Sequence, residues 1–429
     1  MKRPDWQVHA RSGTPQHVRQ CHEPVVAVKV KCLTQAGTRP GNLACSQLGH
    51  PVLRLESGIS PSIVRGPHAT RIRPCVSGLR CTPHCQDHAK EIPMTANATP
   101  ERTEWVSRAE WVADGVAMLE IWYGQNALMA CYLVEGTRRA LIDTGTTDSP
   151  TQAIAPALAK LGRRIEDIDL VLNTHGHIDH AWGNADLKRH APNATISLHA
   201  ADIFLRHQTS LLEFWHKRRL AAGDIDAAAM AFHTQRLAEL ADAPAHFPIP
   251  DRTHAGGDVI DLGGGQTIHV IHTPGHTPGS CSFYVPRARA LLGGDSLTGS
   301  AGEGRFPLLS NVVTYRQTVL DVQHLDVEFV GPAHRYPFRP PANPVVTPAR
   351  PGDLARTFLA DTLTTALDIE AGTAEAWQAN RHGPRRALVA DALIRVGARL
   401  GIDLSGSDHA RAAVGLWLDV FGAPTHIPA

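Results

Sequence analysis

The sequence predicts an α/β (α+β) fold in which two strand-rich halves each supply a set of polar loops. Short apolar runs typical of buried strands alternate with helix-like segments between about residues 104 and 340. Histidine and aspartate gather where several of these runs end. A chain of 429 residues is long enough for two or more domains. We therefore expect a central domain over 94–345, preceded by a distinct segment over 1–93 and followed by a helical region over 346–429.

The first strand-rich half begins near Trp105. Its expected strands are 117–123, 127–134, 139–142, 169–173 and 194–198. The first two are joined by residues 124–126, Gly-Gln-Asn, which is a hairpin signal. Ser149 and Pro150 suit the cap and first position of a helix that reaches Leu161, with Pro156 expected to delay or kink it. A short helix is expected near 184–190.

The second half repeats this character. Its expected strands are 267–271, 281–285, 290–292 and 328–330, with a helix over 314–322. Residues 337–351 are rich in proline and predict a linker. Beyond them, Val389, Leu393, Val396 and Leu400 recur at helical spacing. This C-terminal region is expected to cap the main domain, and a homodimer interface is the alternative.

Residues 200–256 separate the two halves and predict a helical insertion. Ile225, Ala229 and Phe232 lie at the spacing of one helix face. The insertion either roofs a functional site or packs as a helical pair without substrate contact. Its histidines are expected at the surface: His207, His216 and His233.

Residues 1–93 differ in character from the rest of the chain. They hold 13 Lys/Arg, 5 Asp/Glu and six of the eight cysteines, and they lack helix or strand periodicity. Scattered apolar residues cannot offset the entropy of ordering such a segment. We expect a disordered or non-native extension. A basic nucleic-acid-binding arm and a small zinc site are the alternatives, the latter from Cys81, His84, Cys85 and His88.

The densest group of metal-type donors is Thr174-His-Gly-His-Ile-Asp-His180, which places three histidines and an aspartate within six residues. It follows the strand-like run 169–173, so its side chains should converge at the carboxyl end of a strand. Neutral imidazoles and carboxylates are the donors that a borderline cation such as zinc prefers. This stretch therefore predicts a metal site.

Four further motifs also follow apolar runs. They are Leu141-Ile-Asp143-Thr-Gly145, His272-Thr-Pro-Gly-His276-Thr-Pro-Gly-Ser280, Leu291-Leu-Gly-Gly-Asp295-Ser296 and Val330-Gly-Pro-Ala-His334. Taken in order, the five motifs resemble those of the metallo-β-lactamase superfamily over about residues 104–340. The resemblance implies an αββα sandwich, in which two sheets pack face to face with helices outside.

The resemblance also implies a ligand set for two metal ions. The expected ligands of the first ion are His175, His177 and His276. The expected ligands of the second ion are Asp179, His180 and His334. Asp295 is expected to bridge the ions, because two nearby cations need a negative group between them. Two zinc ions per chain are expected, although the same donors accept iron or manganese.

Other motif residues have supporting roles in this prediction. Asp143 is expected to orient a loop or a ligand's ring. Asp179 is expected both to bind metal and to orient the nucleophile or carry its proton. Asp179 and the bridging Asp295 are the predicted catalytic residues. The motif glycines should allow close backbone approach or positive φ: Gly275, Gly279 and Gly294. His272 is expected to be structural.

Together these features predict a metal-dependent hydrolase. A solvent oxygen held between two such cations becomes a hydroxide nucleophile near neutral pH. The motifs around His175 and His276 most resemble glyoxalase-II-type thioesterases and their esterase and lactonase relatives, so we expect a small-molecule ester, thioester or lactone. The long interval from His180 to His276 and the absence of a clear glutathione-binding basic motif depart from glyoxalase II. Asp295 departs from true β-lactamases.

Three other functions remain open at this point. They are a metallo-phosphodiesterase or nuclease, a non-catalytic metal-binding regulatory protein, and an iron enzyme of the persulfide dioxygenase type. Residues 94–429 hold 29 Lys/Arg against 36 Asp/Glu and no basic stripe, which disfavours a nucleic-acid partner.

The sequence also bears on location. It has no apolar run of about 18 residues, so no membrane-spanning helix is expected. Residues 4–7 do not form a signal-peptide core. After residue 93 only Cys131 and Cys281 remain, both within apolar runs. A cytoplasmic protein without a disulfide framework is therefore expected.

Overall fold

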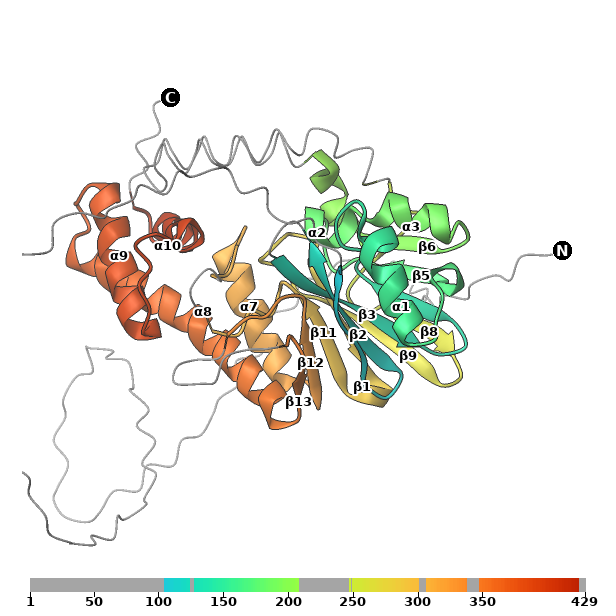
Figure 1. Cartoon of the computed structure of the whole chain (residues 1–429). Coiled ribbons are helices and arrows are strands. Elements are labelled where there is room, and N and C mark those ends of the chain that lie inside the picture. Colours follow the sequence, from blue (N-terminus) through green and yellow to red (C-terminus); the bar gives the residue numbers. More distant parts are fainter. Residues whose placement is uncertain are drawn as a thin grey trace, which may run out of the picture. The chain divides into compact units, whose positions relative to one another are not determined.

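Two mixed β-sheets face each other in the computed structural model, and helices cover their outer faces (Figure 1). The structure describes residues 104–123, 127–207, 247, 249–300, 306–337 and 347–423. The predicted αββα arrangement is confirmed within these residues. The prediction for 1–93 and most of the predicted insertion lie outside them, as do the side chains of its three histidines.

The first sheet has seven strands in sequence order. They are β1 (Val106–Ala113), β2 (Val116–Tyr123), β3 (Ala127–Glu135), β4 (Arg139–Ile142), β5 (Leu170–Leu172), β6 (Thr195–His199) and β7 (Arg252–His254). The strands from β1 to β4 pair antiparallel, whereas those from β4 to β7 pair parallel. The carboxyl ends of β4, β5 and β6 therefore meet at one edge, where the predicted donor loops begin.

The second sheet has six strands in the order β13-β12-β11-β10-β9-β8. They are β8 (Val259–Gly263), β9 (Gln266–His272), β10 (Cys281–Val285), β11 (Ala290–Gly294), β12 (Phe329–Pro332) and β13 (Arg350–Pro351). Only β11 and β12 pair parallel, so their carboxyl ends also lie together. Asp295 follows the end of β11 directly, and His334 lies two residues after the end of β12.

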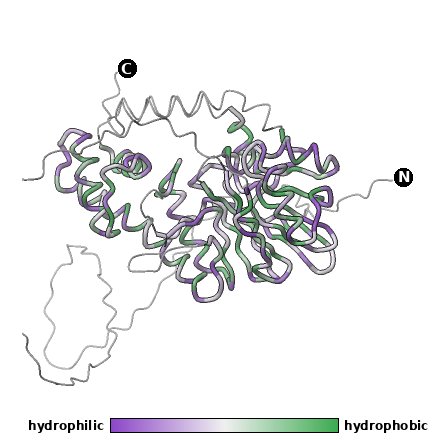
Figure 2. Tube along the Cα trace, viewed as in Figure 1, coloured by the Kyte–Doolittle hydropathy of each residue, from purple (hydrophilic) through white to green (hydrophobic). Residues whose placement is uncertain are grey.

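The main core lies between the sheets. Met118 and Tyr132 of the first sheet share one buried cluster with Val270 and Phe283 of the second. In Figure 2, stretches of hydrophobic residues accordingly run along the strands. Strand β2 is buried on both faces because Leu119 and Ile121 point the other way, toward the helices. That burial explains why β2 reads as a nearly continuous apolar run.

Helices cover both outer faces. They are α1 (Ala155–Lys160), α2 (Ile178–Ala181), α3 (Asn184–His190), α7 (Val312–Asp321), α8 (Asp353–Ala379), α9 (Arg385–Leu400) and α10 (Asp408–Val420). Leu158 and Leu187, from α1 and α3, pack on the first sheet. Phe358 of α8 packs on the second sheet with Val330. Helices α8, α9 and α10 share a further core with α7, which corresponds to the predicted helical cap.

Further short helical segments lie between these elements. They are Pro150–Ile154, Ile165–Asp167, Ala200–His207, Pro286–Ala288 and Val322–His324. None of the helices among the described residues combines the length and apolarity needed to cross a membrane.

The first helical turn begins where the sequence predicts. Ser149 and Pro150 occupy the cap and first helical positions, but the Ser149 hydroxyl accepts a hydrogen bond from the Thr146 N–H at 3.0 Å and none from the helix. The chain makes a wide π-turn over Pro150–Ile154 before α1 begins, as Pro156 had suggested. The predicted insertion and linker each contain a short strand, β7 and β13. Strands of three and two residues are too short to show a period of two.

Candidate metal centre

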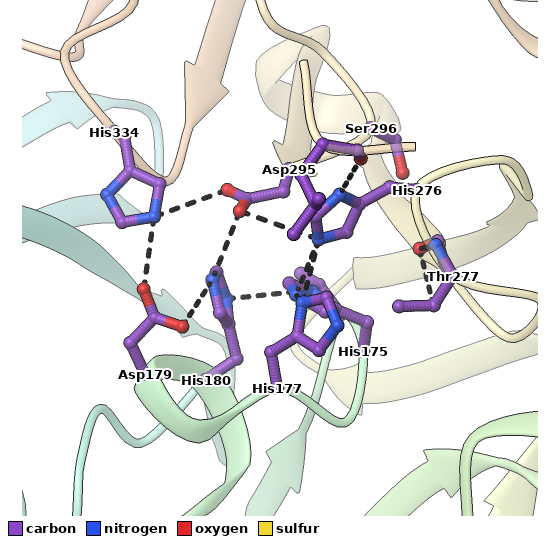
Figure 3. Close-up of polar contacts among 12 residues, drawn as sticks. His175, His177, Asp179, His180, His276, Thr277, Asp295, Ser296 and His334 are labelled. Atoms are coloured by element: carbon purple, nitrogen blue, oxygen red, sulfur yellow. Dashed lines mark hydrogen bonds and ion pairs between the residues drawn. The ribbon is translucent and has the colours of Figure 1, made fainter. Parts of the chain in front are cut away.

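Seven predicted donors converge at one end of the sandwich, where the two sheets meet (Figure 3). The loop after β5 and the helix α2 that follows it supply four of them: His175, His177, Asp179 and His180. Loops after β9, β11 and β12 each supply one: His276, Asp295 and His334. Residues separated by up to about 160 positions are thus brought together by strand ends.

Three histidines form a tight nitrogen triangle. His175 Nε2 lies 3.0 Å from His177 Nδ1 and 3.1 Å from His276 Nε2. His276 Nε2 lies 2.9 Å from His177 Nδ1. Their rings stand nearly perpendicular to one another. We call this group the histidine triad.

The other donors form a mixed group beside the triad. His334 Nε2 lies 3.3 Å from Asp179 Oδ2 and 3.4 Å from Asp295 Oδ1. The second oxygen of Asp295 lies 3.7 Å from His180 Nε2 and 3.6 Å from His276 Nε2. Asp295 therefore stands between the triad and the mixed group of Asp179, His180 and His334.

Hydrogen bonds on the far side of the rings fix which nitrogen faces inward. His276 Nδ1 lies 2.6 Å from the Leu308 carbonyl oxygen, and His334 Nδ1 lies 3.0 Å from that of Leu128. A carbonyl can only accept, so each Nδ1 carries the proton. In its neutral form each ring then presents an unprotonated Nε2 to the centre. This is the arrangement that orients histidine toward a metal ion.

Asp143 fixes the loop after β5 in the same way. One of its oxygens accepts from the Thr174 backbone N–H at 2.7 Å, and the other from the Thr174 hydroxyl at 2.8 Å. That second oxygen also lies 2.8 Å from His180 Nδ1. Because the Thr174 O–H donates to Asp143, the Thr174 hydroxyl oxygen can accept a hydrogen bond from His175 Nδ1 at 3.0 Å. Asp143 thus orients two inward-facing rings without entering the donor cluster.

The donor set fits a metal pair on two observations. The buried atoms His180 Nε2 and Asp295 Oδ1 have no hydrogen-bond partner. Leaving such atoms buried and unpaired is costly. In the histidine triad, the three inward nitrogens lie at hydrogen-bond distance from one another. At least two of them carry a lone pair and no proton, so these two cannot hydrogen-bond to each other. A cation in each group would satisfy these donors together.

Burial and neighbouring charges divide the histidines into two kinds. Burial lowers the pKa of His177 to about 3 and lowers the pKa values of His175 and His276. Burial also opposes protonation of His180 and His334, but nearby carboxylates outweigh it and raise their pKa values.

The carboxylates of the centre are shifted the opposite way. Burial works against ionisation of Asp179 and Asp295, but the adjacent histidines hold the pKa of each carboxyl below its usual range. The protein alone therefore balances charge in the mixed group by protonating histidine.

Two glycines allow the loops to approach this closely. Gly275 has φ +130°, and a Cβ there would lie 2.5 Å from the Cα of Tyr315. Gly294 has φ +51°, and its Cβ would lie 2.6 Å from the Thr174 hydroxyl. Gly279 has no positive φ but abuts Asp202.

Some contributors were not foreseen in the sequence. The roles of the Leu128 and Leu308 carbonyls cannot be predicted from the sequence, because every residue has a backbone carbonyl. Asp202 bonds to both histidine-bearing loops; its one sequence signal is an acidic residue placed just after an apolar strand. His272 points away from the centre, with its ring 2.9 Å from the Pro278 carbonyl and stacked on His199.

Comparisons with known proteins agree with this architecture. The profile of the metallo-beta-lactamase superfamily matches residues 130–334. An uncharacterized protein of Aquifex aeolicus is 30% identical over 163 residues, which cover 37% of this chain and 64% of that protein. A hydroxyacylglutathione hydrolase of Brucella ovis is 29% identical over 155 residues, or 36% of this chain and 42% of the enzyme.

The solved structures add a likeness in fold. A metallo-beta-lactamase family protein of Thermus thermophilus aligns with a TM-score of 0.50 at 20% identity, covering 73% of this chain and 96% of that protein. The alignments with the two curated relatives span less than two thirds of either protein's length.

Proposed function

Residues 130–334 belong to the metallo-beta-lactamase superfamily, and from this membership we propose that the protein is a metal-dependent hydrolase cleaving an ester, thioester or lactone of a small molecule. The observation that carries the proposal is the convergence of seven histidine and aspartate donors, with their ring nitrogens facing inward. None of the seven positions expected from the family pattern is missing in this chain.

Two divalent cations are the proposed cofactors, with zinc preferred. The histidine triad would hold one and the mixed group the other, with Asp295 between them. Bound there, the cations supply Lewis acidity and bring the pKa of water close to neutrality. The protein's contribution is a rigid set of donors whose orientation Asp143, Leu128 and Leu308 maintain.

Asp179 is the proposed proton carrier. Its side chain is 17% exposed, compared with 11% for Asp295 and 0% for His180. It lies 3.3 Å from His334 Nε2 and 3.6 Å from His180 Nε2. A carboxylate that reaches solvent from the edge of the centre can accept a proton from an attacking water and release it.

An acyl substrate is favoured over a nucleic acid. The Brucella relative is named a hydroxyacylglutathione hydrolase, a thioesterase, and its likeness covers about a third of this chain. The net negative charge of residues 94–429 disfavours steering of polyphosphate chains. We do not extend the proposal to glutathione, because the likeness leaves most of this chain uncovered.

The proposal is tested with a panel of thioester, lactone and phosphodiester substrates, before and after removal of metal by a chelator. We expect acyl cleavage that is lost on chelation and restored by zinc. Asp295→Ala should lower kcat/KM by at least about 100-fold, whereas Asp114→Ala, at the distant surface, should not. Acyl cleavage unaffected by complete metal removal would refute the proposal. Cleavage confined to phosphodiesters would show that the substrate is a phosphodiester and not an acyl compound.

A further inference from the structure

Asp202 is a buried carboxylate that is not among the seven donors. It lies in the short helix Ala200–His207, which directly follows β6, and none of its surface is exposed. A buried charge is costly unless it is fully hydrogen-bonded. Its environment must therefore supply donors.

Three donors surround this carboxylate. The Gly176 N–H donates to Oδ2 at 3.0 Å, and the Thr277 hydroxyl donates to the same oxygen at 2.6 Å. The Gly279 N–H donates to Oδ1 at 2.7 Å. Bonds of this kind to an ionised group are roughly twice as strong as neutral ones.

The donors come from both histidine-bearing loops. Gly176 lies between His175 and His177, whereas Thr277 and Gly279 follow closely after His276. One side chain thus joins the loop after β5 in the first sheet to the loop after β9 in the second. A backbone hydrogen bond also joins this region, from the Cys281 N–H to the Thr174 carbonyl at 2.8 Å.

Close approach at Asp202 explains the small residues around it. A Cβ on Gly279 would lie 2.6 Å from Asp202 Oδ1, and one on Gly176 would lie 3.0 Å from the Asp202 carbonyl oxygen. Any larger residue at position 279 would displace the carboxylate. The glycines and Asp202 therefore form one packing unit.

We infer that Asp202 is a positioning residue that sets the spacing of the histidine triad across the two sheets. Its hydrogen bonds join two loops. His175 and His177 lie in the loop after β5, and His276 lies in the loop after β9. Their nitrogens lie 2.9–3.1 Å apart, a spacing that depends on both loops being held together. The inference rests on the proposed metal site, but the loop contacts exist without metal.

The experiment compares wild type with Asp202→Asn, Thr277→Val and Thr277→Ser. Thr277→Val removes the hydroxyl donor at nearly constant volume, whereas Thr277→Ser retains it and is the matched control. Two readouts are used on the full chain. They are the visible absorption spectrum and affinity of added Co²⁺, and hydrogen exchange of peptides 174–180 and 272–280 in the metal-free protein.

We expect Asp202→Asn and Thr277→Val to weaken Co²⁺ binding by about 10- to 100-fold and to change the Co²⁺ spectrum. Both loops should exchange faster in these variants while β3 stays protected. Thr277→Ser should match wild type. A spectrum, affinity and loop exchange unchanged in both Asp202→Asn and Thr277→Val would overturn the inference.

The two proposals fail in different ways. Wild-type protein that binds no Co²⁺ would contradict the proposed function, and metal-free hydrogen exchange would still decide whether Asp202 holds the loops. If Asp202→Asn does not fold, Thr277→Val provides the same comparison with only one of the three hydrogen bonds to Asp202 removed.

Discussion

Asp143 shows how single residues prepare the centre. It adopts φ +62°, a left-handed conformation that glycine, asparagine and aspartate tolerate better than other residues. In that conformation its carboxylate receives bonds from Thr174 and His180. The local backbone strain is offset by three hydrogen bonds that orient the metal-facing loop.

The two kinds of histidine predict stepwise metal loading with pH. Triad histidines have lowered pKa values, so they stay neutral and bind a cation even in mild acid. His180 and His334 have raised pKa values, so they carry protons that a cation must displace. Affinity at the mixed group should therefore rise with pH, by about tenfold per unit for each proton released.

Calorimetric zinc titrations at several pH values between about 5.5 and 8 measure this. One ion should bind at the low end and a second only as the pH rises. Two sites with the same pH dependence would show that the charge balance described here is wrong.

The convergence of the seven residues could be predicted from sequence because six of them occur in short motifs that follow strands. His334 stands more alone but still follows a strand. Residues that hold the donors were harder to predict. Asp202 contacts positions about 26 and 75 residues away, and such contacts arise only once both sheets have formed.

At the scale of elements, α7 supports the loop that carries His276. The Gly275 carbonyl accepts from the N–H groups of Ser310 and Asn311. Asn311 also caps α7 by accepting from the Val313 and Thr314 N–H groups. The first turn of α7 and the loop that carries His276 are thus held by the same few residues.

Gly275→Ala should separate this loop from α7. The new Cβ meets the Tyr315 backbone at 2.5 Å and adds left-handed strain at φ +130°. We expect a loss of about 2–4 kcal/mol in the free energy of unfolding together with weaker metal binding. Gly162→Ala is the matched control, since φ is +69° there and no atom lies within 4 Å of the added Cβ.

Urea denaturation of the metal-free proteins distinguishes the two variants. Gly162→Ala should cost only about 1 kcal/mol, from backbone strain alone. Equal losses in both would mean that the contact with α7 does not constrain the loop.

Element types were predictable where periodicity was long. The α9 positions Val389, Leu393, Val396 and Leu400 are all buried, as their spacing predicts. Ser149 occupies the predicted cap position, but its hydroxyl accepts a hydrogen bond from the preceding turn, at Thr146, and not from the helix. Sequence near a turn does not decide between these two partners.

At the scale of the whole molecule, the C-terminal helices share a core with the segment that follows the β11 loop and leads into α7. Leu309 and Tyr315 belong to the same buried cluster as Leu388 of α9 and Trp417 of α10. Leu308, whose carbonyl orients His276, lies within that segment. The helical region therefore packs against the segment whose backbone orients His276.

Leu388→Ala tests this connection. Leu388 is 1% exposed, so the cavity should cost about 2–5 kcal/mol of stability. Ile394→Ala on the same helix removes a side chain that is 71% exposed and should stay within about 0.5 kcal/mol of wild type. Thermal unfolding followed by circular dichroism compares them. Similar midpoints for both would show that α9 does not pack as described.

We propose that two metal ions lie between the seven donors. Anomalous X-ray scattering at the zinc edge, from crystals grown with zinc, tests it most directly. We predict two peaks in each chain. One should lie about 2.0–2.1 Å from the inward nitrogens of His175, His177 and His276, and the other among Asp179, His180 and His334, with Asp295 reaching both. A zinc-soaked crystal with no peak among these residues would contradict the account.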